Sequence, residues 1–175
     1  MEPKLTFDIK TSRDFYNKML LEYEDFCKNH LSVRYAINCA INSWHLTDWT
    51  FQEYFKDEKK YQDEKREKLK EGKIYVRIYF GLGKYQDELM KQCQSLKYMK
   101  LICNGSKHCI LRDTGIEDKT KIHEGGFAYP DFDRHDYDVD RLVILDKKGQ
   151  QLNFEDIFLE TKVFWADYLK KIENR

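Results

Sequence analysis

The sequence predicts one mainly helical domain, spanning residues 1–175, that carries a small β element. Apolar residues recur at helical spacing in four long segments. One short stretch, by contrast, has the pattern of a β-hairpin. No internal repeat and no linker rich in Gly, Ser or Pro marks a domain boundary. A chain of 175 residues is also long enough to bury one core without disulfides or a metal ion.

The first two helices are expected at residues 13–29 and 33–55. The first has one apolar stripe, which predicts a helix that packs on one side, and Ser12 is its expected N-cap. The second carries apolar residues over most of its circumference, a pattern that is typical of a central helix. We therefore expect Trp44 to be among the most buried side chains.

A charged segment, residues 56–73, follows the second predicted helix. Its charges alternate in sign at helical spacing, and it offers almost no apolar side chain to bury. We expect this segment to be either a solvated extension of the helix or an exposed arm. The next residues, 74–80, are mostly β-branched or aromatic, and this short apolar run fits a strand and a buried helical turn equally well.

The third helix is expected at residues 84–104, where apolar residues again recur at helical spacing. It should end near Gly105, which is a suitable C-cap. Leu96 should be one of its fully buried side chains. Glycines and a proline then punctuate residues 108–140, which are expected to form loops with short strands.

A β-hairpin and a last helix complete the predicted fold. The hairpin spans residues 142–152, with Gly149 in the left-handed conformation of a short loop. The helix spans residues 154–172, begins at Asn153 as its N-cap, and has the strongest periodic pattern in the chain. It should therefore close the core, through Phe158 and Trp165 among others.

Composition narrows the function classes. Lys and Arg number 31, as do Asp and Glu, so the formal net charge is zero. No overall basic field would then attract RNA or an anionic membrane, and such binding would need a local patch. The five cysteines are odd in number and lack CxxC spacing, which predicts reduced thiols. Without a long apolar run or an apolar leader, we expect a cytoplasmic protein with no membrane segment.

A row of polar residues runs along the second predicted helix. Asn38, Asn42 and His45 are followed by Asp48 or Trp49, at spacings of three and four, which places them on one ridge. Asp48 would fix the tautomer of His45 and raise its pKa, as a general acid or base requires. The other interpretation is a structural network that satisfies buried polar groups and fixes the helix register.

A second polar cluster, CNGSKH at residues 103–108, ends the third predicted helix. Asn104 and His108 would face the same way on a helix, and Lys107 adds a mobile cation, so the group could hold a phosphate or move a proton. The structural interpretation is that these residues stop the helix and complement its dipole. Since long helices of a bundle share one core, we expect this cluster to lie against SWHLTDW, residues 43–49.

Several familiar functional motifs are absent from the sequence. The GxGxxG, Walker A, GxSxG and HExxH patterns do not occur. The acidic run at residues 131–140 lacks the glycine that a calcium loop needs, and it is more simply a solvated edge face. No pattern in the sequence therefore calls for a metal ion or a cofactor.

Three segments, together with the hairpin, resemble bacterial proteins related to HEPN domains: RYAINCAINSWHLTDWTFQEYF, LICNGSKHCIL and KVFWADYL. The resemblance covers most of the chain and implies a HEPN-like bundle of about four helices, often a homodimer, of the kind found in toxins and antiviral systems. Many active members cut RNA without a metal ion, using an Arg followed after four to six residues by a His. On that motif Asn104 and His108 match, as substrate-binding and catalytic residues, while Cys103 stands at the Arg position.

Two functions remain open on the sequence. The first is a HEPN-like module that has lost its chemistry and dimerises, or binds a protein of its own operon, in a phage-defence or toxin-antitoxin system. The second is a metal-independent enzyme that cleaves RNA or modifies nucleotides, with His108, His45 and Asp48 as its catalytic residues. Lys100 or Lys107 would replace the missing Arg, although a point charge does not reproduce a bidentate fork. The missing Arg and the zero net charge favour the first function.

Overall fold

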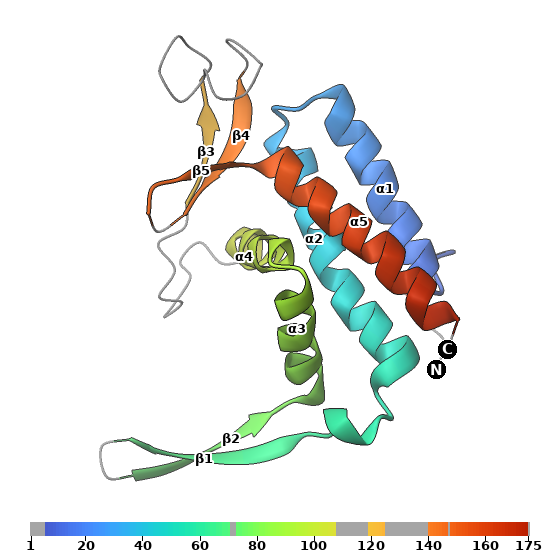
Figure 1. The fold of residues 1–175 in the computed structure, drawn as a ribbon, viewed down its shortest axis with the longest axis vertical. Helices are drawn as coiled ribbons and strands as arrows, with labels where there is room; N and C mark the ends of the chain where they lie inside the picture. Colours follow the sequence, from blue (N-terminus) through green and yellow to red (C-terminus); the bar gives the residue numbers. More distant parts are fainter. Residues whose placement is uncertain (1–5, 71–72, 108–118, 125–139, 147, 175) are drawn as a thin grey trace.

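The computed structural model describes residues 6–70, 73–107, 119–124, 140–146 and 148–174 (Figure 1). Over these residues the chain is mainly helical, with two small antiparallel sheets. The α-helices are α1 (Ser12–Lys28), α2 (Val33–Thr50), α3 (Gly81–Gln92), α4 (Ser95–Lys107) and α5 (Phe154–Glu173). The strands are β1 (Glu64–Lys70), β2 (Lys73–Tyr79), β3 (Lys119–His123), β4 (Arg141–Leu145) and β5 (Gln151–Asn153). The mainly helical fold class is therefore confirmed.

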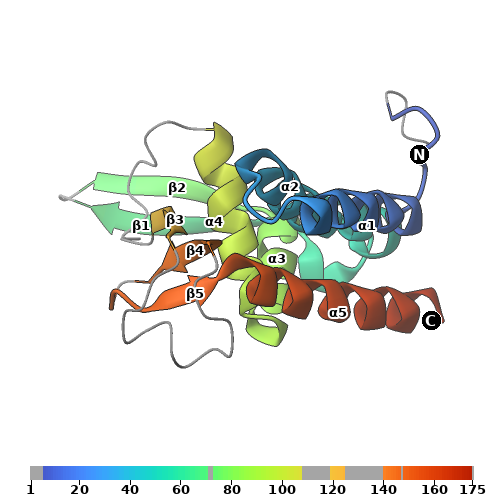
Figure 2. The ribbon, with the colours of Figure 1, turned by 90° about the horizontal axis from the view of Figure 1, so that it is seen from above.

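Helix α2 lies at the centre of the bundle, as the width of its apolar surface predicts. It packs against α1, α3, α4 and α5. Helices α1, α2 and α5 run side by side, and α4 runs across them (Figure 2). After Thr50 the chain adds one π-helical turn, Phe51–Phe55, so the helical segment ends at the predicted residue. The hydroxyl of Thr50 donates to the Leu46 carbonyl at 2.7 Å, which satisfies a buried polar group within the helix.

The N-cap of α1 is Thr11, so the expectation that Ser12 caps this helix is wrong. The Thr11 hydroxyl accepts from the backbone N–H of Asp14 at 3.1 Å, and the Asp14 carboxylate accepts from the N–H of Thr11 at 3.0 Å. This reciprocal capping box needs an acidic or amide side chain three residues after the cap. Thr11 has one there, whereas the residue three after Ser12 is Phe15.

The predicted third helix, residues 84–104, is two helices instead of one. The chain turns at Cys93, which has an extended conformation with φ −136°, although its N–H still bonds to the Leu89 carbonyl at 2.8 Å. The turn lets both Leu89 and Leu96 become fully buried. It also brings the Ser95 hydroxyl to a carboxylate on α5. These contacts come from distant parts of the chain, so local periodicity does not reveal the break.

Residues 56–70 and 73–80 form an arm that projects from the helices (Figure 1). The exposed-arm expectation for residues 56–73 is confirmed, and the helical extension is wrong. After a 3-10 turn at Lys59–Tyr61, strands β1 and β2 pair as an antiparallel ribbon in which Glu64 lies opposite Tyr79. The apolar run left open by the sequence is therefore a strand.

The second sheet has the strand order β3-β4-β5 and lies beside the N-terminus of α5 (Figure 2). Its β4–β5 hairpin confirms the prediction for residues 142–152, including the left-handed Gly149 at φ 77°. The Asp146 carboxylate accepts from the N–H groups of two loop residues, which closes the turn. Asn153 then caps α5 as expected, because its side chain accepts from the N–H of Glu155 at 3.1 Å.

The core predicted from the sequence is confirmed. Leu96, Phe158 and Trp165 are fully buried, and Trp44 is buried as well. Among the described residues, no helix combines the length and apolarity needed to cross a membrane. The four cysteines that the structure describes are free thiols. His108, Cys109 and most of the acidic run at 131–140 lie outside the described residues.

Replacing Trp165 with Ala tests whether α5 closes the core. The indole is fully buried, so its removal leaves a large cavity and should lower the free energy of unfolding by about 3 to 5 kcal/mol. Urea denaturation of the wild type and Trp165→Ala measures the loss. Val163→Ala, at an exposed position of the same helix, is the control and should change stability by less than about 0.5 kcal/mol. Equal stability of the two variants would show that α5 is peripheral.

Candidate functional site

The two polar clusters expected to meet do so in the described residues, on the seam between α2 and α4. The Cys103 sulfur lies 3.7 Å from Nε2 of His45. A second contact on the same seam is between Lys100 of α4 and Trp44 of α2, with Nζ of the lysine 5.3 Å from the ring centroid. Since His108 is outside the described residues, its place relative to His45 stays a prediction.

His45 is half-buried on α2, and its surroundings disfavour the charged imidazolium. Burial lowers the pKa of His45, and the positive charges of Lys107 and Lys18 lower it further. No hydrogen bond joins His45 to Asp48 in the described part of the chain, so the carboxylate does not orient the imidazole there. The neutral form of His45 is therefore favoured at pH 7, and this ring has one N–H that can donate a hydrogen bond and one nitrogen that can accept one.

The neighbours of His45 are also pushed toward their neutral forms. Burial raises the pKa of the Asp48 carboxyl, although the Lys107 cation opposes this effect. Burial likewise raises the pKa of the Cys103 thiol, against the same cation. A thiol that is fully buried and held protonated is a poor nucleophile, because the thiolate is the reactive form. The Cys103–His45 contact is thus closer to core packing than to a nucleophile and its base.

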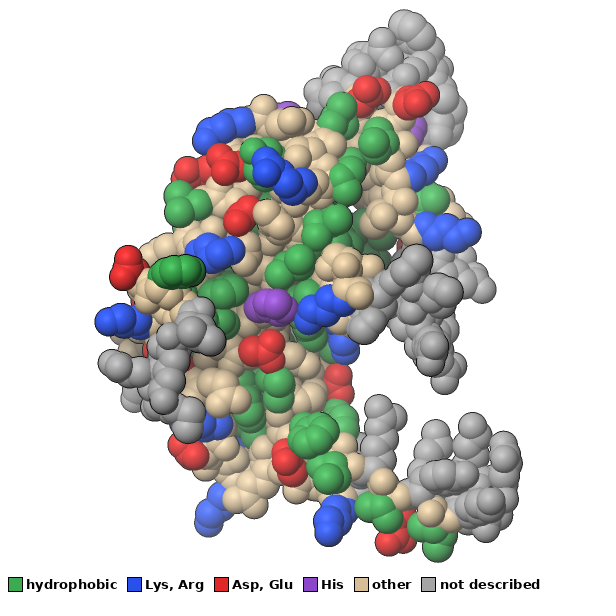
Figure 3. Space-filling model, turned by 180° about the vertical axis from the view of Figure 1, so that it is seen from behind, with side chains coloured by type: hydrophobic (Ala, Val, Ile, Leu, Met, Phe, Trp, Pro, Cys, Tyr) green, Lys and Arg blue, Asp and Glu red, His purple; other side chains and the backbone are tan. Residues whose placement is uncertain are grey.

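The remaining predicted site residues lie on α4 around Cys103. Asn104 is half-buried, and Lys107 is exposed on the last turn of the helix. The charge of Lys107 acts on His45 and Asp48. Since Lys107 is exposed, it is the solvent-facing member of the group. On the face shown in Figure 3, histidine, acidic and basic side chains are exposed close together among apolar ones. In the described residues the seam thus brings Lys107 near His45 and Asp48 and places Lys100 over Trp44, while Asn104 follows Cys103 on α4.

Three residues of the polar ridge on α2 contact α1 and belong to a structural network: Asn38, Asn42 and Trp49. Lys18 donates to Oδ1 of Asn42 at 2.7 Å, and Asn38 donates to Glu22 at 3.0 Å. Lys18 and Glu22 are themselves an ion pair at 3.5 Å. Trp49, which continues the ridge, stacks on an aromatic ring of α1. For Asn38, Asn42 and Trp49 the structural interpretation of the ridge therefore holds.

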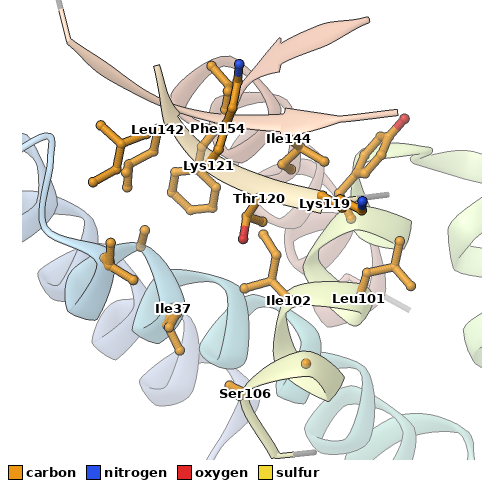
Figure 4. Close-up of a pocket in the computed structure, with 16 residues that line it drawn as sticks. Ile37, Leu101, Ile102, Ser106, Lys119, Thr120, Lys121, Leu142, Ile144 and Phe154 are labelled. Carbon is orange, nitrogen blue, oxygen red and sulfur yellow. The ribbon is translucent and has the colours of Figure 1, made fainter. Parts of the chain in front are cut away.

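An open, largely apolar pocket lies on the other side of α4, with a volume of about 500 Å³ (Figure 4). Helices α2 and α4 form one wall, and strands β3 and β4 form the other. Thr120 reaches from β3 toward Ile102 on α4 (Figure 4). Two lysines, Lys119 and Lys121, are exposed on the same strand. The apolar side chains around the cavity include Ile37, Ile102, Leu142, Ile144 and Phe154.

This pocket was missed by the reasoning from sequence. Its walls come from α2, α4, β3, β4 and the first residue of α5, and none of these segments alone has a pattern that indicates a binding site. The clearest signal in the structure is exposure, because Val33 and Ile122 line the pocket with about half of their side chains open to solvent. A concave apolar surface with a few polar groups at its edge is the usual form of a binding site.

Two further observations bear on what the site can hold. Among the described residues, no group of three His, Cys, Asp or Glu side chains is arranged to hold a metal ion. Comparisons of the chain with models of known protein families, with curated proteins and with solved structures find no match. What the protein can do must therefore be judged from its own geometry.

His45→Gln tests the burial of a neutral imidazole. The folded-state pKa of His45 lies below its ordinary value of 6.5, so the unfolded chain takes up a proton first as the pH falls. The wild type should therefore lose stability as the pH drops below about 6.5, and the glutamine variant should lose less. Melting temperatures at pH 7.5 and 5.5 measure the difference. An identical loss in both proteins would show that the folded state does not disfavour the imidazolium.

Asp48→Asn tests the cost of a half-buried carboxylate. Its pKa is raised, so the charged form present at pH 7 is destabilising, and the amide should raise the melting temperature. The advantage should shrink as the pH falls through the raised pKa, because the wild-type carboxyl then becomes neutral as well. Asp167→Asn, at an exposed position on α5, is the matched control and should bring no such gain. A variant less stable than wild type at pH 7 would contradict the argument.

Proposed function

We propose that this protein is a HEPN-like partner-binding module, and that its binding site is the apolar pocket between α2, α4 and strands β3 and β4. The observation that carries the proposal is the pocket itself, an open cavity of about 500 Å³. Half-exposed apolar side chains such as Val33 and Ile122 would be covered by a partner. Each Å² of apolar surface removed from water contributes roughly 25 cal/mol, so the pocket favours an apolar occupant.

The charges at the pocket indicate the chemistry of the partner. Lys119 and Lys121 are exposed on β3, and both line the cavity. We infer that the partner is a protein segment that inserts apolar side chains and carries Asp or Glu beside them. Such a pairing would combine burial with charge complementarity, which adds specificity and speeds association.

The HEPN-like part of the proposal rests on the sequence resemblance and on one feature of the fold. All five α-helices contribute to one core, which is one helix more than the resemblance implies, and the β4–β5 hairpin directly precedes the last helix. The place of the hairpin before the last helix is the feature that supports the proposal. The corresponding setting is the cytoplasm of a bacterium, in a phage-defence or toxin-antitoxin system.

A metal-independent enzyme that cleaves RNA or modifies nucleotides is the second candidate. One observation favours it, which is the convergence of Lys107 with His45 and Asp48. Against it stands Cys103, which occupies the motif's Arg position and is fully buried and uncharged. The thiol offers no donor fork for a developing phosphate charge, so transition-state stabilisation would depend on lysine alone.

Ile122→Asp tests the pocket as the binding site. Co-expression with the products of the genes that flank its own should yield a complex, and calorimetry then gives its Kd. A carboxylate in the apolar pocket must be desolvated on binding and also opposes an acidic partner, so Ile122→Asp should weaken the complex at least tenfold. Val163→Asp introduces the same charge at an exposed position on α5 and should leave the Kd unchanged.

The same preparation distinguishes the two candidates. Purified protein is incubated with a mixed RNA pool in the presence of a metal chelator. The binding module predicts intact RNA and a complex that depends on Ile122. Cleavage that is lost in His45→Gln, while melting shows a folded variant, would overturn the binding module in favour of the enzyme. A complex equally tight for Ile122→Asp and wild type would place the partner elsewhere and would refute the pocket.

A further inference from the structure

The β1–β2 ribbon is fixed firmly to α3 at its base. The backbone N–H of Gly81 donates to Oδ1 of Asp63 at 2.8 Å, and a Cβ on Gly81 would lie only 1.6 Å from the Tyr61 carbonyl oxygen. The hydroxyls of Tyr61 and Tyr79 both donate to carboxylates of α3. The ribbon therefore leaves the body in a set direction and presents its two faces in fixed positions (Figures 1 and 2).

One face of this ribbon carries a row of exposed apolar side chains. They occupy alternate positions along β2 and just beyond it, which places them on the same face of the ribbon. Their exposed fractions are 67% for Ile74, 59% for Val76, 45% for Ile78 and 60% for Phe80. An isolated two-stranded ribbon is marginally stable in water, and such a row weakens its solubility unless another surface covers it.

The neighbouring strand adds one charge of each sign to this face. In the register of the ribbon, Lys65 lies opposite Ile78 and Glu67 lies opposite Val76. Directly opposed residues of an antiparallel pair share a face, so the two charges flank the apolar row. Lys65 and Glu67 are two residues apart on β1, which corresponds to roughly 7 Å along the strand.

We propose that this face binds the same face of a second copy of the chain. The two-fold axis lies between the two ribbons, perpendicular to their strands and midway between residues 65 and 67. It stacks β1 on β1 and β2 on β2, with the strands of the two copies in opposite directions. Lys65 of each copy then lies over Glu67 of the other, and the apolar row lies over its own copy. Sheets packed face to face are about 10 Å apart, a gap that a lysine and a glutamate reaching from both sides can bridge.

Self-complementarity is what distinguishes a second copy from other occupants. A closed two-fold contact uses the same patch twice, so a patch with one Lys and one Glu satisfies both charges without any outside partner. An anionic membrane or a nucleic acid would gain from Lys65 but would be opposed by Glu67. The interface is independent of the apolar pocket, because none of its residues lines that cavity.

The size of the face sets the expected strength of the dimer. Seven residues of strand span roughly 23 Å, so the face is smaller than the approximately 800 Å² that each partner contributes to a standard interface. Association should therefore be weak and should rise with protein concentration. Sedimentation velocity over a concentration series measures it directly, with the wild type shifting from monomer to dimer.

Charge-swap variants provide the sharpest test. Lys65→Glu places two carboxylates over each other in the dimer, and Glu67→Lys places two ammonium groups together, so each should weaken dimerisation severalfold. The double variant Lys65→Glu/Glu67→Lys restores both pairs in reversed order and should restore dimerisation. Val76→Asp should keep the protein monomeric, whereas Ile122→Asp in the pocket should have no effect on it.

Three results would overturn the proposal. The first is a wild type that remains monomeric throughout the concentration series. The second is a Val76→Asp variant that dimerises as the wild type does. The third is a double variant whose dimerisation stays as weak as that of the single variants. Binding of the wild type to anionic phospholipid vesicles or to the RNA pool that is lost in Val76→Asp, without self-association, would assign the face to a different partner. Circular dichroism of each variant confirms that the fold is intact.

Discussion

The structure depends on the packing of every other helix against α2. Because α2 is covered on most sides, its buried polar groups are stabilised by partners inside the protein, although the Ser43 hydroxyl has none among the described residues. The hydroxyl of Tyr85 donates a hydrogen bond to the Thr50 hydroxyl at 2.8 Å, and the Gln86 amide donates to the Thr47 hydroxyl at the same distance. These two bonds join α3 to the C-terminal half of α2. They fix the axial position of α3 and, through it, the root of the ribbon.

Two surfaces are left open by this arrangement, and they lie at opposite ends of the molecule (Figure 1). The apolar pocket is between α4 and the β3–β4 strands, and the apolar row is on the ribbon beyond α3. Two copies joined at their ribbons would keep both pockets accessible. A partner with two binding segments could then occupy both at once, which raises its apparent affinity without any new contact. A small module can in this way act as a connector.

The sequence predicts those parts of the fold whose signals are local. Helix α5 follows from its periodicity and from Asn153, and the β4–β5 turn follows from Gly149. The break at Cys93 could not be predicted, because it depends on contacts between Ser95 and α5. The charges of residues 56–73 suit a helix and a ribbon alike, since alternation in sign does not distinguish the two periods when nothing is buried.

The candidate site, like the fold, could be predicted from the sequence only in part. That His45 lies against the end of α4 follows from the sharing of one core by long helices, and the prediction is confirmed by its contact with Cys103. The neutral states of His45 and Cys103 could not be predicted, because the desolvation of each group depends on how many side chains surround it. The apolar pocket was likewise invisible, since cavities arise between segments rather than within them.

Gly81 has a consequence for ancestry as well as for structure. At the junction of β2 and α3 the backbone passes so close to the Tyr61 carbonyl that no side chain fits. Any side chain at this position would force the backbone around Tyr61 to shift. Glycine at this position, two residues after the tyrosine that ends β2, therefore serves as a marker. It separates chains that carry the arm in this orientation from chains that share only the helices.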